Sequence, residues 1–503
     1  MTTVQHDIQD KINKKLWSAC DTFRGAVPST QYQNYILTFL FLKYVSDVHQ
    51  EAYDKLKEQY GKDDERIKRR LERERFVLPE HCSFNFVFEN KNKDNVGEII
   101  NQALRGIAQA NPKKLGQVFG DIDFNSESIL GRPAEKNARL RDLINLFHDI
   151  DLRPSVVGTQ DIVGNSYEYL IARFAEDAGQ KGGEFYTPAG VAQLLAEVVD
   201  PKDGETIYDP TCGSGSLLIR TANLVKSKNY SIYGQESNAS TWALCKMNMF
   251  LHGIDNANVE RGDTIRGPIF LEGNSVKKFN KVVANPPFSL DKWGLEEAQV
   301  DPYGRFKKRD LPPKSKGDFA FIIHMVESLL ERGTAAVVVP HGVLFRGASE
   351  GKIRESFVKE NLIDSVIGLP SNLFYGTGIA AAVIVLKKGR KHKDILFIDA
   401  SHDFEPGKRQ NKLRIEGENA DIPRIIECYK KRKVINKYSA LISLDEIKAN
   451  EFNLNISRYV DSSDEEVEID IHAIQKEIAT LEKRLDDTRK EMKKYLKELG
   501  LNG

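Results

Sequence analysis

The feature that most constrains the fold of this chain is a pair of short motifs, each directly after an apolar run rich in β-branched residues. The first is a glycine loop at 209–215 (Asp-Pro-Thr-Cys-Gly-Ser-Gly), and the second is Asn-Pro-Pro-Phe at 285–288. Glycine lets a backbone turn approach a ligand closely, and a helix that starts there directs free N–H groups at a carboxylate. The pair therefore predicts a ligand site within an α/β domain.

The sequence from about 156 to 400 predicts a parallel sheet with crossover helices, because short β-rich runs alternate with amphipathic stretches. The expected strands are 206–209, 231–235, 259–262, 281–284, 335–339, 365–369, 381–386 and 395–398. The expected helices are 191–199, 216–226, 240–252, 319–332 and 352–361. Open sheets of this kind bind ligands at the carboxyl ends of their strands. The Asp-Pro, Gln-Glu, Gly-Asp and Asn-Pro-Pro signals all fall at those ends.

The length of 503 residues suggests more than one domain, and we expect three regions. Residues 1–155 indicate a helical domain, with apolar positions such as Tyr35, Ile36, Phe39 and Leu40 at helical spacing. Residues 156–440 are expected to form the α/β catalytic domain. Residues 441–503 are expected to form a linker and a partner-binding helix.

The expected C-terminal helix carries an apolar stripe with heptad-like spacing, after an acidic linker at 461–468. The members of this stripe are Ile471, Ile474, Ile478, Leu481, Leu485, Met492, Tyr495 and Leu496. The stripe weakens at Thr488, which favours pairing with helices of a partner over a long coiled coil. The alternative is that it packs back on the chain's own helical domain.

Charge and cysteine usage narrow the functional class. Lys+Arg and Asp+Glu are both 73, so the formal net charge is zero. A protein that bound duplex DNA alone through phosphate contacts would usually be basic. The zero net charge therefore indicates either a local basic patch or another subunit that makes most of the DNA contacts. The five cysteines lack pairing or metal-ligand spacing, which predicts reduced thiols and no metal site. Without a long apolar run or a signal-peptide core, we expect a cytoplasmic protein with no membrane span.

Asn-Pro-Pro-Phe is suited to the chemistry of an exocyclic amino group. The N6 amine of adenine is a poor nucleophile, because its lone pair is delocalised into the ring. If the side-chain oxygen of Asn285 and the backbone carbonyl of Pro286 each accept one N6–H, that lone pair can face a methyl donor. Pro286 and Pro287 fix φ and hold the carbonyl, and Phe288 can stack on an extruded base. We expect catalysis by positioning and electrostatics rather than by a strong base.

Acidic residues at two further strand ends are suited to S-adenosylmethionine. Glu236 ends the second expected strand, about 20 residues after the glycine loop, where it could bind ribose hydroxyls. Asp263 ends the third, where it could accept a hydrogen bond from the amino group of the cofactor's adenine. Each carboxylate alone is more often a helix cap. Their series along one edge favours the ligand interpretation.

The chain resembles the modification (methyltransferase) subunits of type I restriction-modification systems, within the amino-methyltransferases whose motif is Asp/Asn-Pro-Pro-Tyr/Phe. The segments that carry the resemblance are 183–188 (Gly-Glu-Phe-Tyr-Thr-Pro), 209–215, 235–236 (Gln-Glu), 285–288 and 318–321 (Asp-Phe-Ala-Phe). It extends over nearly the whole chain, including 372–378 (Asn-Leu-Phe-Tyr-Gly-Thr-Gly). The resemblance implies a Rossmann-like S-adenosylmethionine-dependent methyltransferase domain with an N-terminal helical domain and a C-terminal helical tail. It also implies methylation of adenine N6 in a specific DNA sequence.

The resemblance further implies roles for residues and partners. The residues implied to close over the methionine part of the cofactor are Glu184, Phe185, Tyr186, Thr187 and Pro188. The residues implied to form the wall beneath it are Asp209, Thr211, Gly213, Ser214, Gly215 and Ser216. The implied partners are double-stranded DNA, a specificity subunit, a second copy of this chain and, where one is present, a restriction (nuclease and translocase) subunit. The chain has no P-loop motif, so ATP-driven translocation belongs to another chain.

A basic run after the catalytic motif suggests where DNA phosphates could bind. Its members are Arg305, Lys307, Lys308 and Arg309. We expect them to contact the DNA phosphates around a flipped base. A merely solvated loop is the alternative. Two other functions stay open from the residues: an RNA or protein amino-methyltransferase, and a noncatalytic assembly subunit that retains the cofactor fold. Methyl transfer to unmethylated DNA, with and without a co-purified partner, separates them.

Overall fold

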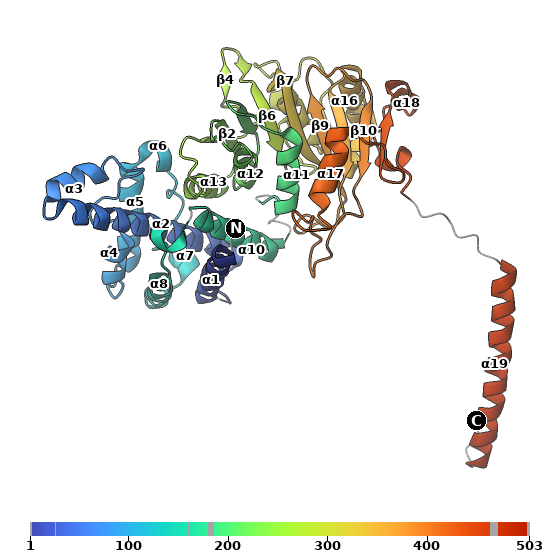
Figure 1. Ribbon diagram of the computed structural model, residues 1–503, viewed down its shortest axis with the longest axis horizontal. Coiled ribbons are helices and arrows are strands. Elements are labelled where there is room, and N and C mark those ends of the chain that lie inside the picture. The colour runs from blue at the N-terminus through green and yellow to red at the C-terminus, as the bar shows by residue number, and fades with distance from the viewer. Residues whose placement is uncertain (1–2, 26, 159, 180–185, 463–470, 500–503) are drawn as a thin grey trace. The chain divides into compact units, whose positions relative to one another are not determined.

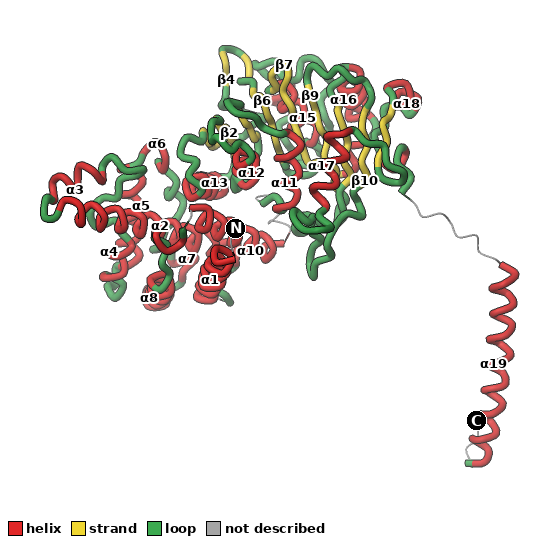
Figure 2. The backbone as a smooth tube through the Cα atoms, in the orientation of Figure 1, coloured by secondary structure: helices red, strands yellow, loops and turns green. Residues whose placement is uncertain are grey.

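The structure, a computed structural model, describes residues 3–25, 27–158, 160–179, 186–462 and 471–499. It divides into two compact units, Met1–Asp461 and Ser462–Gly503. The first unit combines a helical part with an α/β part, as Figure 1 and Figure 2 show. None of the helices in the described ranges is long and apolar enough to cross a membrane.

The helical part has one apolar core, in which α2 (Ser29–Tyr60) is central. Residues 35–47 of α2 are all buried, so this stretch is enclosed on every side and not only on one face. Phe39 lies against Phe84, Phe124 and Phe147, with ring centroids 5.8, 5.7 and 5.4 Å away. The other helices here are α1 (Thr3–Ala19), η1 (Cys20–Thr22), α3 (Asp64–Leu71), α4 (Phe84–Glu89), α5 (Val96–Ala110), α6 (Pro112–Leu115), α7 (Glu127–Leu130), α8 (Pro133–His148), α9 (Pro154–Val157) and α10 (Gln160–Ala178).

The α/β part is built on a nine-stranded sheet with the order β11-β10-β8-β9-β7-β6-β1-β2-β3. Its strands are β1 (Thr206–Asp209), β2 (Ser231–Glu236), β3 (Asn258–Arg261), β6 (Phe279–Ala284), β7 (Leu329–Pro340), β8 (Ile363–Gly368), β9 (Ala381–Lys387), β10 (Ile395–Asp399) and β11 (Ser439–Ile442). A separate hairpin is formed by β4 (Leu271–Glu272) and β5 (Ser275–Val276). Each expected strand is therefore present, within a few residues at its ends.

Apolar side chains alternate between two cores, one on each face of the sheet. Val283 belongs to one core, whereas its neighbours Val282 and Ala284 belong to the other. This period of two is what a strand buried on both faces requires. The helices of this part are α11 (Ala189–Val199), α12 (Ser216–Asn223), α13 (Ala239–Leu251), α14 (Leu295–Gln299), α15 (Asp318–Glu327), α16 (Ala348–Lys359), α17 (Asp421–Lys431) and α18 (Leu444–Ala449).

The sheet is not wholly parallel, and this part of the sequence prediction was wrong. Strand β9 runs antiparallel to both β7 and β8, and β11 runs antiparallel to β10. A parallel neighbour needs a crossover connection, usually a helix. The segment between β8 and β9 contains no helix, so the chain returns in the opposite direction. A strand's direction is not encoded in its local apolar pattern.

The boundaries of the parts also differ from those expected. The helical core continues through α10, beyond residue 155. At the other end, residue 440 lies inside β11, and the first unit extends to Asp461. Ile447 of α18 and Ile456 of η4 (Ile456–Arg458) are buried in the same core as the sheet residue Val366. Helix α15 ends at Glu327 rather than at residue 332, because β7 begins at Leu329.

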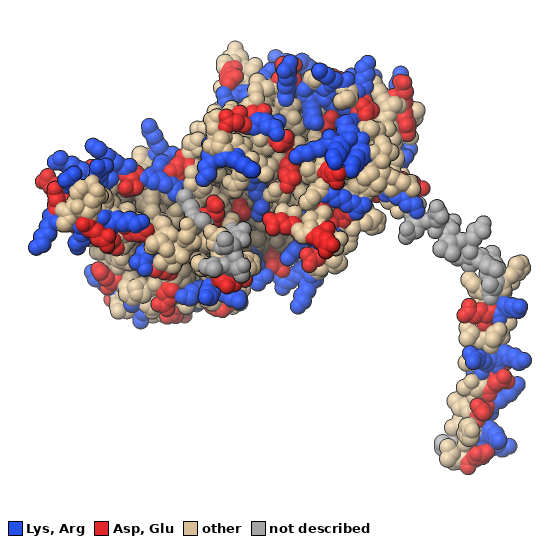
Figure 3. Space-filling view, in the orientation of Figure 1, with Lys and Arg blue, Asp and Glu red and all other residues tan. Residues whose placement is uncertain are grey.

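The second unit is dominated by one helix, α19 (Ile471–Glu498). The apolar stripe expected there is exposed within this unit. Its side chains include Ile474, Ile478, Leu481, Leu485, Met492 and Tyr495, each between 45 and 57% exposed. Basic and acidic side chains also lie along this helix, as Figure 3 shows, so the exposed apolar seam lies on a highly charged helix.

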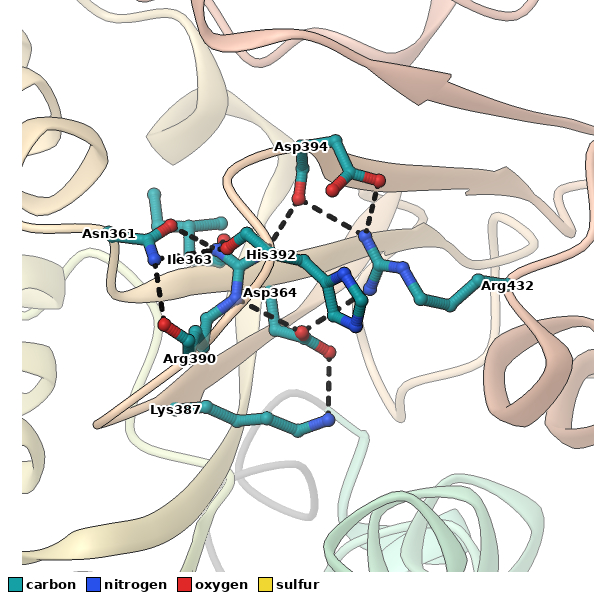
Figure 4. Close-up of polar contacts among 8 residues, drawn as sticks. All are labelled: Asn361, Ile363, Asp364, Lys387, Arg390, His392, Asp394 and Arg432. Carbon is teal, nitrogen blue, oxygen red and sulfur yellow. Dashed lines mark hydrogen bonds and ion pairs between the residues drawn. The ribbon is translucent and has the colours of Figure 1, made fainter.

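A buried carboxylate ties the amino end of β8 to three neighbouring segments, as Figure 4 shows. Asp364 is only 4% exposed and lies 3.0 Å from Lys387 Nζ at the end of β9. It also lies 3.2 Å from Arg390 Nε and 3.3 Å from an Arg432 nitrogen just after α17. Arg432 contacts Asp394 as well, at 3.1 Å. One carboxylate is thus shared by three cations, so its loss would leave them without their common partner.

We expect Asp364→Asn to lower the free energy of unfolding by about 3–5 kcal/mol, because it leaves the buried Arg390 guanidinium uncompensated. Asp394→Asn is the matched control. The Asp394 side chain is 35% exposed, so its loss should cost under about 1 kcal/mol. Urea unfolding followed by circular dichroism measures both. Equal losses in the two variants would contradict a central role for Asp364.

Candidate functional site

The acidic and amide residues singled out in the sequence meet at the carboxyl edge of the sheet. Asp209 ends β1, Glu236 ends β2, Asp263 follows β3 and Asn285 follows β6. These strands are neighbours in the order β6-β1-β2-β3. Because their carboxyl ends lie side by side, residues distant in sequence converge on one site.

The glycine loop needs its glycines for two separate reasons. Gly213 and Gly215 have φ of 54° and 82°, in the left-handed region that favours glycine. A Cβ on Gly215 would lie 2.7 Å from the Cys245 sulfur, so there is no room for a side chain. The loop is fixed from outside by Asn248, whose Nδ2 donates to the Ser214 carbonyl at 3.0 Å.

Glu236 connects the glycine loop to the end of the neighbouring strand. Its Oε2 accepts a hydrogen bond from the Gly213 N–H at 3.0 Å, and its Oε1 accepts from the Asn238 N–H at 2.8 Å. Burial raises the pKa of this carboxyl above its ordinary value. Two backbone donors therefore orient a half-buried carboxylate at the cleft, where ribose hydroxyls could reach it.

Asp209 is held in an environment suited to a cation. The residue is 2% exposed, and burial raises the pKa of its carboxyl to about 8, with nearby Glu236 adding to the rise. The Thr211 N–H donates to its Oδ1 at 2.9 Å. A positive group placed beside Asp209 would restore the charged form.

The Asp263 carboxylate is bound by backbone N–H groups and also by a cation. Its Oδ1 accepts from the N–H groups of Ile265 and Arg266, at 2.9 and 3.0 Å. Its Oδ2 pairs with the Arg266 guanidinium at 2.7 Å. The residue nevertheless lines the cleft, as do Glu236 and Asn238.

Two adjoining cavities open at this edge. The larger, of about 430 Å³, is lined by Glu236, Asp263 and Pro287 among others. The smaller is lined by Tyr186, Thr187, Asp209, Cys212, Gly213, Ser214, Ser216 and Leu217. Thr211 and Asn285 line both cavities. Ribose would lie by Glu236 and the cationic tail by Asp209, so the residues present fit S-adenosylmethionine.

Asn285 presents a hydrogen-bond acceptor that the described residues do not use. Its Nδ2 donates to Thr187 Oγ1 at 3.2 Å, which fixes the amide plane. Its Oδ1 is buried and has no hydrogen-bond partner. A buried acceptor left alone costs about 1–3 kcal/mol. This oxygen is therefore suited to a donor that arrives with a ligand.

The aromatic residue of the motif is supported from the 372–378 segment. Phe288 is half-buried and lies edge-on to Phe374, with ring centroids 5.4 Å apart and planes at 69°. The rings of Tyr375 and Tyr186 are tilted at 45° to each other, with centroids 5.9 Å apart. The late segment therefore joins the two sides of the site.

Asp318 holds the turn that follows Phe288. Its Oδ1 accepts from the Ser289 N–H at 2.8 Å, and its Oδ2 accepts from Arg346 at 2.6 Å. Ser289 has φ of 50°, a conformation that needs such support. Asp318 is thus a positioning residue, whereas Phe321 of the same segment lines the larger cavity.

The expected DNA contacts of the basic run need correction for its two arginines. Arg305 is 2% exposed, and its guanidinium donates to Asp301 and to the carbonyls of Thr264 and Ile265, at 2.7–3.1 Å. The Arg309 side chain is also 2% exposed and pairs with Glu327 and Glu360. Neither is available to a phosphate. Arg305 instead holds the segment that follows Asp263.

Two lysines of the run remain available, and a third joins them. Lys307 and Lys308 are exposed. Lys316 lies beside the catalytic motif, with Nζ 3.4 Å from Ser289 Oγ. With Lys314, which is also exposed, these three are basic side chains of this region that could contact DNA.

Some site residues were missed and some lie outside the structure's description. Gln33 of α2 lines the larger cavity, although nothing in its local sequence signals this. Asn248 and Gln235 were missed as supports; the Gln235 side chain holds the segment 267–269. Tyr186 is 7% exposed, and Pro188 caps α11. Glu184 and Phe185 lie outside the described residues.

Comparisons with known proteins agree with this geometry. A model of the N-6 DNA methylase family matches residues 158–468, and one of the HsdM N-terminal domain matches residues 12–147. The type I restriction enzyme MpnII methylase subunit of Mycoplasma pneumoniae is 31% identical over 97% of this chain and 96% of that protein. The MjaVIII methylase subunit of Methanocaldococcus jannaschii is 31% identical over 98% and 85%.

A solved structure is similar as well. The type I restriction-modification methyltransferase subunit from Streptococcus thermophilus is 35% identical, with a TM-score of 0.81. The match covers 90% of this chain and 100% of the Streptococcus thermophilus chain. The likeness therefore includes both the helical and the α/β parts.

The raised pKa of Asp209 predicts a pH-dependent difference in stability from Asp209→Asn. Between pH 4 and 8 the folded state keeps a proton that the unfolded state has released, so wild type loses stability as pH rises. The variant lacks this group, so its stability relative to wild type should increase by up to about 1.4 kcal/mol per pH unit and level off above pH 8. Urea unfolding at several pH values measures the difference. A difference that is constant with pH would contradict the raised pKa.

Proposed function

The chain belongs to the N-6 DNA methylase family, among the methylase subunits of type I restriction-modification systems, and we propose that it methylates N6 of adenine within a specific DNA sequence. The observation that carries the proposal is the buried Asn285 oxygen, which is fixed in orientation yet has no hydrogen-bond partner among the residues that the structure describes. It follows Ala284 and lines both cavities, so it would lie between a bound cofactor and an incoming base.

The cofactor would be held by residues from both cavities. Glu236 would accept the ribose hydroxyls, and Gly213–Ser216 would lie against the chain that leads to the amino acid part. Asp209 would face the amino group, because burial and the nearby Glu236 charge raise the pKa of its carboxyl and a positive group beside it would restore the charged form. When bound, S-adenosylmethionine supplies a methyl group on a positively charged sulfur.

The target amine would be prepared by two acceptors. Asn285 Oδ1 would take one N6–H and the Pro286 carbonyl the other, which turns the nitrogen lone pair away from the ring. Thr187 keeps the Asn285 oxygen aimed, because it occupies the amide nitrogen. Phe288 would stack on the extruded adenine. The amine loses one proton after methylation, and water can accept it because the product amine is weakly basic.

DNA binding would require a partner as well as this chain. The formal net charge is zero, and within the described part of the basic run only Lys307 and Lys308 are free of the buried ion pairs made by the arginines. With Lys316 they can contact phosphates near the target base. We assign sequence recognition to a specificity subunit and expect two copies of this chain in the complex, with a restriction subunit where the system has one. Such a complex would act on cytoplasmic DNA.

The exposed stripe of α19 is proposed as the surface that binds helices of the specificity subunit. Ile474, Ile478, Leu481 and Leu485 each expose about half of their side chains. Burying such an apolar seam against a partner helix contributes roughly 25 cal/mol per Å². The competing reading is that the stripe packs on this chain's own helical part.

The catalytic proposal predicts different losses for Asn285 and Thr187 variants. Asn285→Ala should reduce methyl transfer by at least about 100-fold, because an acceptor for the amine is lost. Thr187→Val should reduce it about tenfold, whereas Thr187→Ser keeps the hydroxyl and most of the activity. Radiolabelled transfer to unmethylated DNA, followed by nucleoside analysis for N6-methyladenine, measures both.

Cofactor affinity is the control for these variants. Calorimetry should place S-adenosylmethionine binding by Asn285→Ala within several-fold of wild type. Substantial methyl transfer by Asn285→Ala would reject its role. Label found only in RNA or protein would reject DNA as the substrate.

The tail proposal predicts the outcome of deleting residues 465–503. The shortened chain should fold and bind S-adenosylmethionine, because the first unit ends at Asp461. It should no longer co-purify with the specificity subunit or methylate the recognised site. Leu481→Asp in the full chain is the matched point variant. Loss of folding would support packing on the chain's own helices, and normal assembly would contradict both readings.

A further inference from the structure

Two large apolar side chains are exposed at the same edge of the sheet as the catalytic motif. Phe345 is 46% exposed and follows η3 (His341–Leu344), which begins directly after β7. Ile379 is 54% exposed and lies just before β9. Since β9 runs antiparallel to β7, its start is at the edge where β7 ends.

The contacts of the two loops bring Phe345 and Ile379 to one pair of strand ends. Pro340 of β7 is opposite Ala381 of β9, and the His341 N–H donates to the Ala380 carbonyl at 3.0 Å. The Phe345 ring lies edge-on to the His341 ring, with centroids 6.1 Å apart. Both apolar side chains are therefore anchored at positions that the sheet fixes.

Both loops are also linked to the segment that presents Asn285, one through Asp318 and the other directly. Arg346, next to Phe345, donates to Asp318, which in turn accepts from the Ser289 N–H after Phe288. The loop that carries Ile379 also carries Phe374, which lies against Phe288. The loop of Phe345 is thus linked to the motif through Asp318, and the loop of Ile379 is linked to it through Phe374.

We propose that Phe345 and Ile379 contact the DNA bases that flank the extruded adenine. This rests on the proposed function, because an adenine in a duplex must leave the stack to reach the buried Asn285 oxygen. Extrusion unstacks the neighbouring bases at a cost of a few kcal/mol, and apolar side chains placed against exposed base faces offset it.

The surroundings of this pair favour DNA over a protein partner. Gly347 and Gly378 lie beside the two side chains, and a Cβ on either glycine would meet nothing within 4 Å, so the edge is open. A protein seated there would cover the edge at which Asn285 and Phe288 lie. DNA, by contrast, must reach that edge for its adenine to enter.

The test uses the complex of this chain with its specificity subunit. The substrate is an unmethylated duplex that carries the recognised site, which is identified by mapping methylated adenines in host DNA. Phe345→Ala should methylate this duplex about 10- to 100-fold more slowly, the range given by base stacking. With 2-aminopurine in place of the target adenine, its fluorescence increase on binding should also fall several-fold. Ile379→Ala should show a smaller loss of both. S-adenosylmethionine affinity and melting temperature should not change.

Two matched comparisons make the test specific. Leu330→Ala removes a similarly exposed side chain, 38%, at the opposite end of β7, and should methylate normally. Placing an abasic site opposite the target adenine makes extrusion easier, so the deficit of Phe345→Ala should shrink on that duplex. Phe345→Leu keeps apolar bulk and should retain more activity than Phe345→Ala.

Three results would overturn the inference. The first is normal methylation by Phe345→Ala, and the second is an equal loss of its methylation rate on the normal and abasic duplexes. The third is failure of Phe345→Ala to assemble with the specificity subunit, which would make this edge a protein interface. If wild type itself does not methylate adenine, the proposed function fails instead. The wild-type arm therefore separates the two failures.

Discussion

The hydrogen bond from the Gly213 N–H to the Glu236 carboxylate joins the ends of β1 and β2, and the rest of the site is arranged about this junction. It fixes the left-handed loop that starts α12 and orients the carboxylate at the cleft at the same time. Asp209 lies beneath the loop, and its raised pKa follows from burial there and from the nearby Glu236 charge. Removing the bond would disturb the backbone, the acid and the cavity wall together.

The fold was predictable where local pattern and global position agree. Runs such as Val282–Ala284 must be strands buried on both faces, and the glycine loop must be a turn, so the edge of the sheet that carries the candidate site followed from the sequence. The direction of β9 could not be predicted, because a strand's apolar pattern is the same in either direction. Strand β11 was missed because it follows α17, beyond the regular alternation of strands and helices.

The site was predictable for residues that lie next to strand ends and not for those that reach it from elsewhere. Arg305 looked like a phosphate ligand because its run is basic. Its burial depends on Asp301 and on carbonyls of Thr264 and Ile265, which the sequence does not place nearby. Asp318 was noticed as part of a motif, but only the structure shows that it supports Ser289. Long-range partners decide whether a charged residue binds a ligand or holds the fold.

The position of Gln33 gives the helical part a share in the ligand site. This residue belongs to α2, whose core is made with α10 and other helices, yet it lines the larger cavity beside Glu236 and Asn238. The affinity of a ligand that contacts Gln33 depends on the position of α2. By thermodynamic reciprocity, occupancy of the cavity must shift the stability of the α2 arrangement by the same free energy. Ligand binding in the larger cavity and the position of α2 are therefore energetically coupled.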